Sequence, residues 1–240
     1  MAQRYLLPSL PEPGETVLRG ELAHHLGRVA RARPGETIRL GDGRGNSAAA
    51  TVVAVHKGAV HLQVQLPHHV PRPAVALHVA FAPPRLQRAE WLFEHGTEVG
   101  IDVFLPLWTE RSRPHGERQD RWQRIVQAAA GQCGRDWLPE VSPARELAEF
   151  LADPALPGLR LVGALGGPPL PRAIALEATA SAAVWLVGPE GGFGEAEQRV
   201  IEAAGFRPCG LGPHTLRTET AALVGAAWLR VSLADQGPLR

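Results

Sequence analysis

The stretch VWLVGPEGGFGEAE, residues 184–197, decides the fold of this chain. An apolar run typical of a buried strand leads into a cluster of glycines around Pro189 and Glu190, and an acidic helix start follows. Glycines at the end of a strand let the backbone approach a ligand without a Cβ in the way. The spacing is neither GxGxxG nor GxxxxGK[ST], so the usual dinucleotide and P-loop geometries do not apply. The pattern indicates a ligand loop of another class, and a simple tight turn remains the alternative.

The same alternation of strand and helix extends on both sides of this stretch. Strands are expected at 75–81, 103–108, 159–165, 182–187 and, in a shorter form, 206–211. Helical spacing of apolar residues falls at 88–98, 118–132, 143–152, 194–204 and 217–233. Strands rich in Val and Leu with helices between them predict a parallel α/β sheet covered on both faces. In such sheets ligands bind beyond the carboxyl ends of the strands.

Residues 1–70 follow a different rhythm. Between 35 and 66 apolar residues alternate with polar ones, as in Ile38 and Leu40 and again from Val60 to Leu66, which predicts half-buried antiparallel strands. A short helix is expected over 21–31, and the proline-rich segment 67–73 suits a stiff linker. We therefore predict a small β-barrel domain at 1–70 and an α/β domain at 74–240.

Composition limits the class of protein. The chain has 240 residues, of which 45% are hydrophobic and 20% charged, an ordinary globular balance. No apolar run approaches the length of about 18 residues that suggests a membrane span, and the first residues lack the apolar centre of a signal peptide. Cys133 and Cys209 are far apart with no CxxC pattern, so neither a metal site nor a disulfide framework is expected. We expect a cytoplasmic protein.

A second glycine-bearing loop lies in CGLGPHTLRTETAALVGAAWLRV, residues 209–231. Thr218 can cap the helix that follows, and Glu219 can complement its dipole. Those functions leave Arg217 beside them unexplained. Two glycine-bearing loops at the ends of neighbouring strands could form opposite walls of one pocket.

These residues resemble a known family. GPEGGF followed by LGPHTLRTETA closely resembles the signature of the SPOUT class of methyltransferases, and specifically the ribosomal RNA small-subunit methyltransferase E family, which makes 3-methyluridine in 16S rRNA. Arg4-Tyr5 resembles the start of the family, residues 25–31 a family helix with Ala30 in place of leucine, and residues 109–112 its TERS motif. Residues 129–135 resemble a further helix end that keeps Gln132 and Arg135 but lacks an acid. His95 departs from the lysine that the family commonly has.

The resemblance implies a PUA-like β-barrel followed by an α/β domain with a deep trefoil knot, which binds S-adenosylmethionine and forms a homodimer. It implies 16S rRNA within the 30S ribosomal subunit as the partner, and neither a membrane nor a metal. Carried over by motif, the cofactor-binding residues are Leu165, Gly166, Gly188, Glu190, Gly191, Gly192, Leu211, Gly212, Leu216, Arg217 and Thr218.

Methylation at N3 of uridine requires removal of a proton, and negative charge then develops on the uracil oxygens. We expect Arg217 to stabilise that charge, and Glu190 and Glu219 are both candidates for the base, with no preference between them. Either acid could instead hold a loop in place. Phosphates are expected to contact Arg4, Arg31, Arg111, Arg113 and Arg135. For any one of these arginines a solvated basic surface is the better explanation, and only the set taken together favours phosphate contact.

Two other functions fit parts of the sequence. A non-catalytic RNA-binding or ribosome assembly factor could retain the cofactor-binding knot without turnover. A nucleotide hydrolase could use GPEGG as an anion loop, but the chain has neither a P-loop lysine nor a cluster of metal ligands. Labelled methyl transfer to 30S subunits distinguishes an enzyme from a binding factor.

Overall fold

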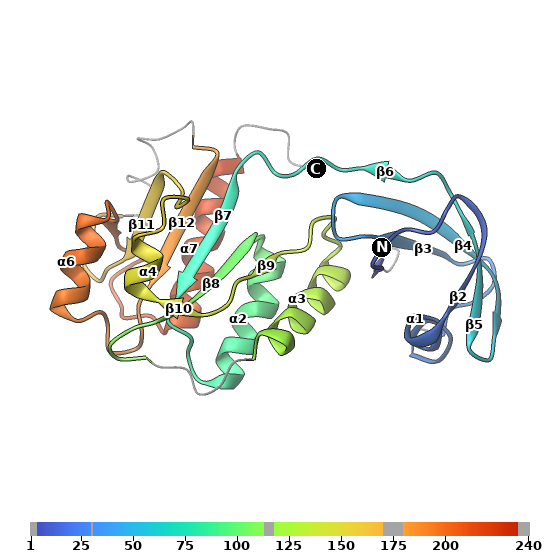
Figure 1. Ribbon diagram of the computed structural model, residues 1–240, viewed down its shortest axis with the longest axis horizontal. Coiled ribbons are helices and arrows are strands. Elements are labelled where there is room, and N and C mark those ends of the chain that lie inside the picture. Colours follow the sequence, from blue (N-terminus) through green and yellow to red (C-terminus); the bar gives the residue numbers. More distant parts are fainter. Residues whose placement is uncertain (1–3, 30, 113–117, 170–179, 235–240) are drawn as a thin grey trace. The chain divides into compact units, whose positions relative to one another are not determined.

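A computed structural model of the chain describes residues 4–29, 31–112, 118–169 and 180–234 (Figure 1). The chain forms two compact units. The first contains residues up to Arg72 together with Ala130–Leu138, and the second contains Pro73–Ala129 and the residues from Pro139 onward.

The first unit is built on a mixed sheet whose main order is β1-β3-β4-β5-β2. Its strands are β1 (Arg4–Leu6), β2 (Gly14–Arg19), β3 (Thr37–Gly41), β4 (Asn46–His56), β5 (Ala59–Val64) and β6 (His68–His69), which pairs with β4. The expected antiparallel pairing is confirmed for the pairs β2–β5, β3–β4 and β4–β5, whereas β1 pairs with β3 in parallel. Helix α1 (Gly20–His24) continues as a π-helical turn (His25–Val29).

The alternating pattern of β3 and β5 buries one face of this sheet. Ile38, Leu40, Val60 and Leu62 are almost fully buried, and Leu26 of the π-helical turn packs into the same core. Because successive side chains of a strand point to opposite faces, the polar residues between them face away from the core.

Residues 130–138 belong to the first unit through several specific contacts. Arg4 forms an ion pair with Asp136 at 2.9 Å and donates a hydrogen bond to the carbonyl of Gly134. The indole N–H of Trp137 donates to the carbonyl of Val70 at 2.8 Å, and the guanidinium of Arg72 lies 4.3 Å from the centroid of the Trp137 ring.

The second unit contains a parallel sheet of order β10-β8-β7-β12-β11-β13, with β9 pairing with β8. Its strands are β7 (Ala76–Phe81), β8 (Val103–Trp108), β9 (Glu140–Val141), β10 (Arg145–Glu146), β11 (Leu159–Gly163), β12 (Ala182–Val187) and β13 (Arg207–Cys209). Its helices are α2 (Leu86–Val99), α3 (Gln119–Cys133), which runs into the first unit, α4 (Leu147–Leu151), α6 (Glu195–Ala203) and α7 (Thr218–Ala234).

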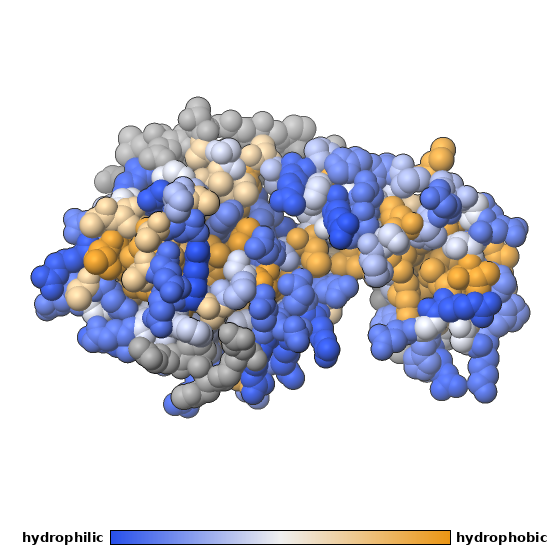
Figure 2. Space-filling model, in the orientation of Figure 1, coloured by the Kyte–Doolittle hydropathy of each residue, from blue (hydrophilic) through white to orange (hydrophobic). Residues whose placement is uncertain are grey.

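Helices cover both faces of this sheet, as its apolar strands predict. On one face α7 packs against β7, β12 and α2. On the other, Phe150 of α4 and Ile201 of α6 share a core with Val184 and Leu186 of β12. Trp185, between those two strand residues, points to the α7 side and donates its indole N–H to the carbonyl of Ala221. Charged and polar residues cover most of the visible surface (Figure 2).

The structure contains short strands that the sequence did not predict, among them β6 within the expected linker and β10. The helix expected over 143–152 is shorter, because Arg145 and Glu146 pair with β8 as strand β10 before α4 begins. Among the described residues, no helix is long and apolar enough to cross a bilayer.

Candidate functional site

A cavity of about 600 Å³ lies where β11, β12 and β13 end. Its walls come from the last residues of these strands and from the loops that follow them, as the parallel sheet predicted. The lining is mainly apolar and includes Leu165, a residue that is 67% exposed. A cavity of this size with an exposed apolar residue at its wall suits a small organic ligand.

The loop 188–192 forms one wall of the cavity, with Gly188, Pro189, Glu190 and Gly192 in its lining. Gly192 has a φ of +69°, in the left-handed region that favours glycine. A Cβ built at Gly192 would meet no described atom within 4 Å, so it would not clash with the protein. Glycine at this position therefore serves the left-handed backbone conformation, and it leaves the cavity space beside it free for a ligand.

The opposite wall comes from the segment between β13 and α7. Leu211, Gly212, His214, Thr215 and Leu216 line the cavity there. Hydrogen bonds join the start of this segment to the loop after β11: the Ala164 N–H donates to the Cys209 carbonyl at 2.9 Å, and the Gly210 N–H donates to the Pro168 carbonyl at 2.8 Å. The two walls are also joined directly, because Thr218 Oγ1 donates to the carbonyl of Gly188 at 3.0 Å.

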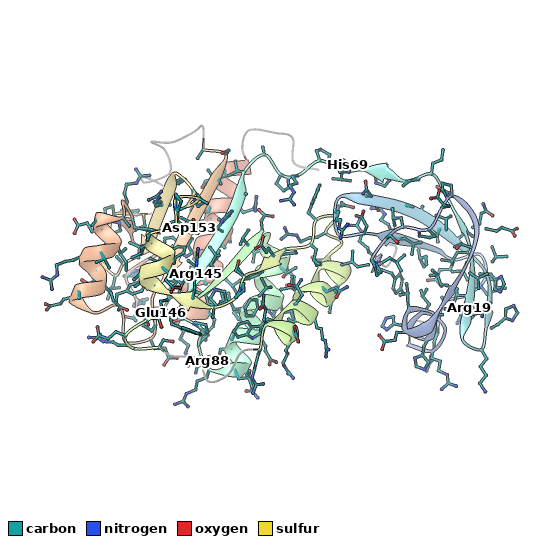
Figure 3. The ribbon with its side chains drawn as sticks, viewed as in Figure 1. Arg19, His69, Arg88, Arg145, Glu146 and Asp153 are labelled. Atoms are coloured by element: carbon teal, nitrogen blue, oxygen red, sulfur yellow. The ribbon has the colours of Figure 1, made fainter. Side chains whose placement is uncertain are left out.

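Two acidic residues and one arginine meet beside the cavity. The Arg88 guanidinium donates to Glu190 Oε1 at 2.6 Å and lies 3.6 Å from Glu219 Oε1. The Glu190 side chain is 62% exposed, whereas that of Glu219 is 7% exposed. Oε2 of Glu219 is buried and has no hydrogen-bond partner within the described ranges. Sequence reasoning missed Arg88, which comes from the first turn of α2 and is labelled in Figure 3.

The TERS segment, residues 109–112 after β8, makes hydrogen bonds that hold the loop 188–192, here called the glycine loop. Arg111 donates to the carbonyl of Gly191 at 2.6 Å. The Glu110 N–H donates to one carboxylate oxygen of Glu197, and the Gly194 N–H donates to the other. Glu197 thus joins the end of β8 to the start of α6, which keeps the glycine loop between two fixed segments.

Known proteins share both domains of this chain. The sequence profile of the RNA methyltransferase domain matches residues 71–230, and that of the RNA methyltransferase PUA domain matches residues 18–65. The ribosomal RNA small subunit methyltransferase E of Synechocystis sp. is 33% identical, over 88% of this chain and 71% of that protein. Its counterpart in Mycobacterium bovis is 32% identical, over 93% of this chain and 89% of that protein. This chain belongs to the ribosomal RNA small subunit methyltransferase E family.

Two solved structures have the same fold as this chain. The ribosomal RNA small subunit methyltransferase E of Neisseria gonorrhoeae, bound to S-adenosyl methionine, superimposes with a TM-score of 0.86 at 28% identity, over 96% of this chain and 98% of that one. A Legionella pneumophila protein solved with bound SAM gives a TM-score of 0.86 at 28% identity, over 97% and 98% of the two chains. The expected SPOUT-class α/β fold behind a PUA-like domain is confirmed.

The structure brings together most of the cofactor residues that the family motifs implied. Eight of them line the cavity: Leu165, Gly188, Glu190, Gly192, Leu211, Gly212, Leu216 and Thr218. Gly166, Gly191 and Arg217 are in the same loops but are not part of the lining, and Arg217 is exposed. The lining also contains Gln198 and Glu202 of α6, which the motifs did not point to.

The arginines expected to contact RNA lie in different environments. Arg31 and Arg111 are exposed, whereas Arg4 is buried against Asp136. Arg135 donates to the carbonyl of Trp137 at 3.2 Å. Arg113 lies outside the described residues.

His95, where the family commonly has lysine, stacks on Trp91 with ring centroids 4.4 Å apart and donates from Nδ1 to the Trp91 carbonyl at 2.9 Å. This side chain is therefore fixed against its own helix.

Cys209 lies in the cavity wall, fully buried. Burial raises the pKa of its thiol, and the nearby charge of Arg207 opposes that effect only in part. The thiol is therefore neutral near pH 7, unlike a reactive cysteine. No group of three or more potential ligands among the described His, Cys, Asp and Glu residues could hold a metal ion.

Proposed function

We propose that this protein uses S-adenosylmethionine to methylate N3 of a specific uridine in 16S rRNA, with the assembled 30S subunit as substrate. The observation that supports this best is the cavity between the glycine loop and the segment before α7, in a chain of the methyltransferase E family. When bound, the cofactor supplies an activated methyl group.

The cavity lining has the chemistry that such a cofactor needs. Leu165, Val187 and Phe206 offer apolar surface for an adenine ring, and the carboxylates of Glu190 and Glu202 suit a ligand that carries positive charge. We assign cofactor binding to the lining residues together with Gly166, Gly191 and Arg217 of the same loops.

The residues beside the cavity can perform the proton chemistry. Glu190 or Glu219 takes the proton from N3 of the uridine, and Arg217 stabilises the negative charge on the uracil oxygens. The fixed loops contribute by holding the reacting groups in line.

RNA contact is assigned to the PUA-like domain through exposed arginines such as Arg31, and to Arg111 beside the cavity. In this proposal Arg4 acts indirectly, because its side chain holds residues 134–136. A ribosomal substrate places the protein in the cytoplasm.

The second unit is proposed to form a homodimer. Helices α2 and α7 cover the same face of the sheet, and each carries large apolar side chains exposed to water: Leu86, Trp91, Trp228 and Val231. Exposed apolar residues on neighbouring helices are typical of a protein interface. Light scattering should give twice the chain mass, and a monomer that still methylates RNA would refute the dimer.

The function is tested with purified protein, labelled S-adenosylmethionine, and either 30S subunits or naked 16S rRNA from cells that lack the enzyme. Digestion and mass spectrometry of nucleosides should give 3-methyluridine from 30S subunits. Transfer to naked rRNA alone would contradict the assembled substrate. Binding of cofactor and RNA with no transfer to either substrate would favour a non-catalytic assembly factor.

A further inference from the structure

Arg88 connects two acidic residues that come from different parts of the chain. It lies in the first turn of α2, Glu190 lies in the glycine loop after β12, and Glu219 lies in the first turn of α7. Both acids face the same guanidinium, which has donors in a fixed planar fork and can serve two carboxylates at once.

The two acids differ in exposure and in place. Glu190 lines the cavity and its side chain is 62% exposed, so water and a substrate can reach it. Glu219 is 7% exposed and is not part of the cavity lining. A buried carboxylate that keeps its charge needs a partner, and Arg88 is the cation paired with it in the described structure.

We propose that Glu190 is the base that removes the N3 proton, and that Glu219 and Arg88 are positioning residues acting through it. Glu219 holds the guanidinium from the buried side, and the guanidinium holds Oε1 of Glu190 at 2.6 Å. This inference rests on the proposed function and deepens it, because it separates the roles of the two candidate acids.

The proton transfer is balanced within this arrangement. The N3–H bond of the uridine breaks, its proton passes to Oε2 of Glu190, and the electron pair stays on N3, which becomes the nucleophile. Arg88 occupies Oε1, so the second oxygen is left for the proton. Without Arg88, the exposed Glu190 side chain would lose little by turning to other rotamers, and the base would spend less time in place.

The test is a double-mutant cycle on Arg88 and Glu190. Glu190→Gln should lower kcat on the order of 100-fold, as expected for loss of a general base. Arg88→Met should lower kcat by roughly 10- to 100-fold, as for a misplaced catalytic group. The double variant should be no slower than Glu190→Gln alone, because residues that act as one unit are not additive. Equal cost of Arg88→Met in both backgrounds would overturn the proposal, and so would full activity of Glu190→Gln.

Two further variants separate positioning from a general effect on the fold. Arg88→Lys should recover part of the lost rate, since an ammonium keeps the charge but cannot hold two carboxylates as the planar fork does. Arg145→Met is the matched control: Arg145 pairs with Asp153 at 2.8 Å in the same unit and is not part of the cavity lining. Its kcat should equal that of the wild type.

Cofactor binding gives a readout that does not depend on turnover. Calorimetry with S-adenosylmethionine should show a much smaller loss of affinity for Arg88→Met than its loss of kcat. A loss of affinity as large as the loss of kcat would place Arg88 in the cofactor site and overturn the proposal. The rate of each variant is measured as the total labelled methyl transferred to RNA, and the methylated nucleoside is identified separately by mass spectrometry. A product other than 3-methyluridine would refute the proposed function while the cycle still tests Arg88. Absence of transfer to any RNA would refute both.

Discussion

Gly192 lies in the cavity wall and has a left-handed backbone conformation. We predict that Gly192→Val weakens S-adenosylmethionine binding at least tenfold, because the new side chain is strained at this φ and enters open cavity space. Calorimetry measures the affinity. Gly58→Val is the control, since Gly58 has a φ of +81° with equally open surroundings but lies in the β4–β5 hairpin. It should lose similar stability and keep full affinity, and unchanged affinity of folded Gly192→Val would refute the assignment of this loop.

Asp42 organises the turn between β3 and β4. Its carboxylate accepts the backbone N–H groups of Arg44 at 2.7 Å and Asn46 at 3.1 Å, and the side-chain amide of Asn46 at 2.6 Å. Partial burial acts to raise the pKa of Asp42, but these hydrogen bonds to the charged form outweigh it, so the pKa is lowered. An asparagine side chain at position 42 has one acceptor oxygen in place of two. Its own NH2 group would then face the NH2 group of Asn46, and neither could accept a hydrogen bond from the other.

We therefore predict that Asp42→Asn costs about 1 kcal/mol of stability near neutral pH. A group whose folded pKa is lowered stabilises fully above the unfolded pKa of about 3.9, and this stabilisation is lost as the pH falls through the folded pKa. Urea unfolding of both proteins should give a constant difference between pH 7 and 5 that disappears in stronger acid. Glu12→Gln, at an exposed acid of the same unit, is the control. A difference that persists unchanged in strong acid would contradict the prediction.

At the scale of elements, α7 lies close enough to β12 that only glycine fits at position 225. A Cβ there would overlap the indole of Trp185, which is fully buried. We predict that Gly225→Ala destabilises the protein by about 1–3 kcal/mol through overpacking, more than the gain of about 1 kcal/mol from helix propensity.

The control for this prediction is Gly131→Ala in α3, where a Cβ would lie 3.4 Å from the Arg4 carbonyl oxygen, an ordinary contact. Only the propensity gain should remain there, so this variant should be slightly more stable than the wild type in denaturant unfolding. If Gly225→Ala is no less stable than Gly131→Ala, then α7 can move away from the sheet more easily than the packing indicates.

The sequence predicts elements well where their pattern is local. The strands of the second unit are continuous apolar runs, and β8 and β12 match their expected bounds. The parallel pairing of β1 with β3 and the strand β10 depend on distant partners, and no local pattern marks them. The short strand β10 occupies residues whose spacing alone reads as helix.

The same limit applies to the site. Both glycine-bearing loops could be found, because close approach to a ligand constrains the residues within each loop. Arg88 could not be found, because its partner Glu190 is 102 residues away and the helix around it reads as an ordinary amphipathic one. Only the folded sheet brings α2, the β12 loop and α7 together.

At the scale of the whole molecule, charge divides between the two parts of the chain. Residues 1–72 carry nine Lys and Arg against five Asp and Glu, whereas residues 73–240 carry 16 against 19. A net positive domain attracts the RNA backbone, whereas residues 73–240 have a net negative charge and gain no such general attraction. This difference suggests that the PUA-like domain holds RNA while the α/β domain transfers the methyl group.

This division of labour predicts opposite effects for two arginines. Arg31→Ala should weaken binding to 30S subunits and reduce the salt slope by about one, since each phosphate contact releases roughly one counterion, and it should leave cofactor affinity unchanged. Arg217→Ala should lose turnover while RNA affinity holds. Arg19→Ala, at another exposed arginine of the first unit labelled in Figure 3, should leave the slope nearly unchanged if the contact is specific. RNA and cofactor titrations at several salt concentrations measure all three variants. An unchanged slope for Arg31→Ala would move the RNA contact to the arginines of 111–135, because the first unit would then contribute charge without holding a phosphate at this position.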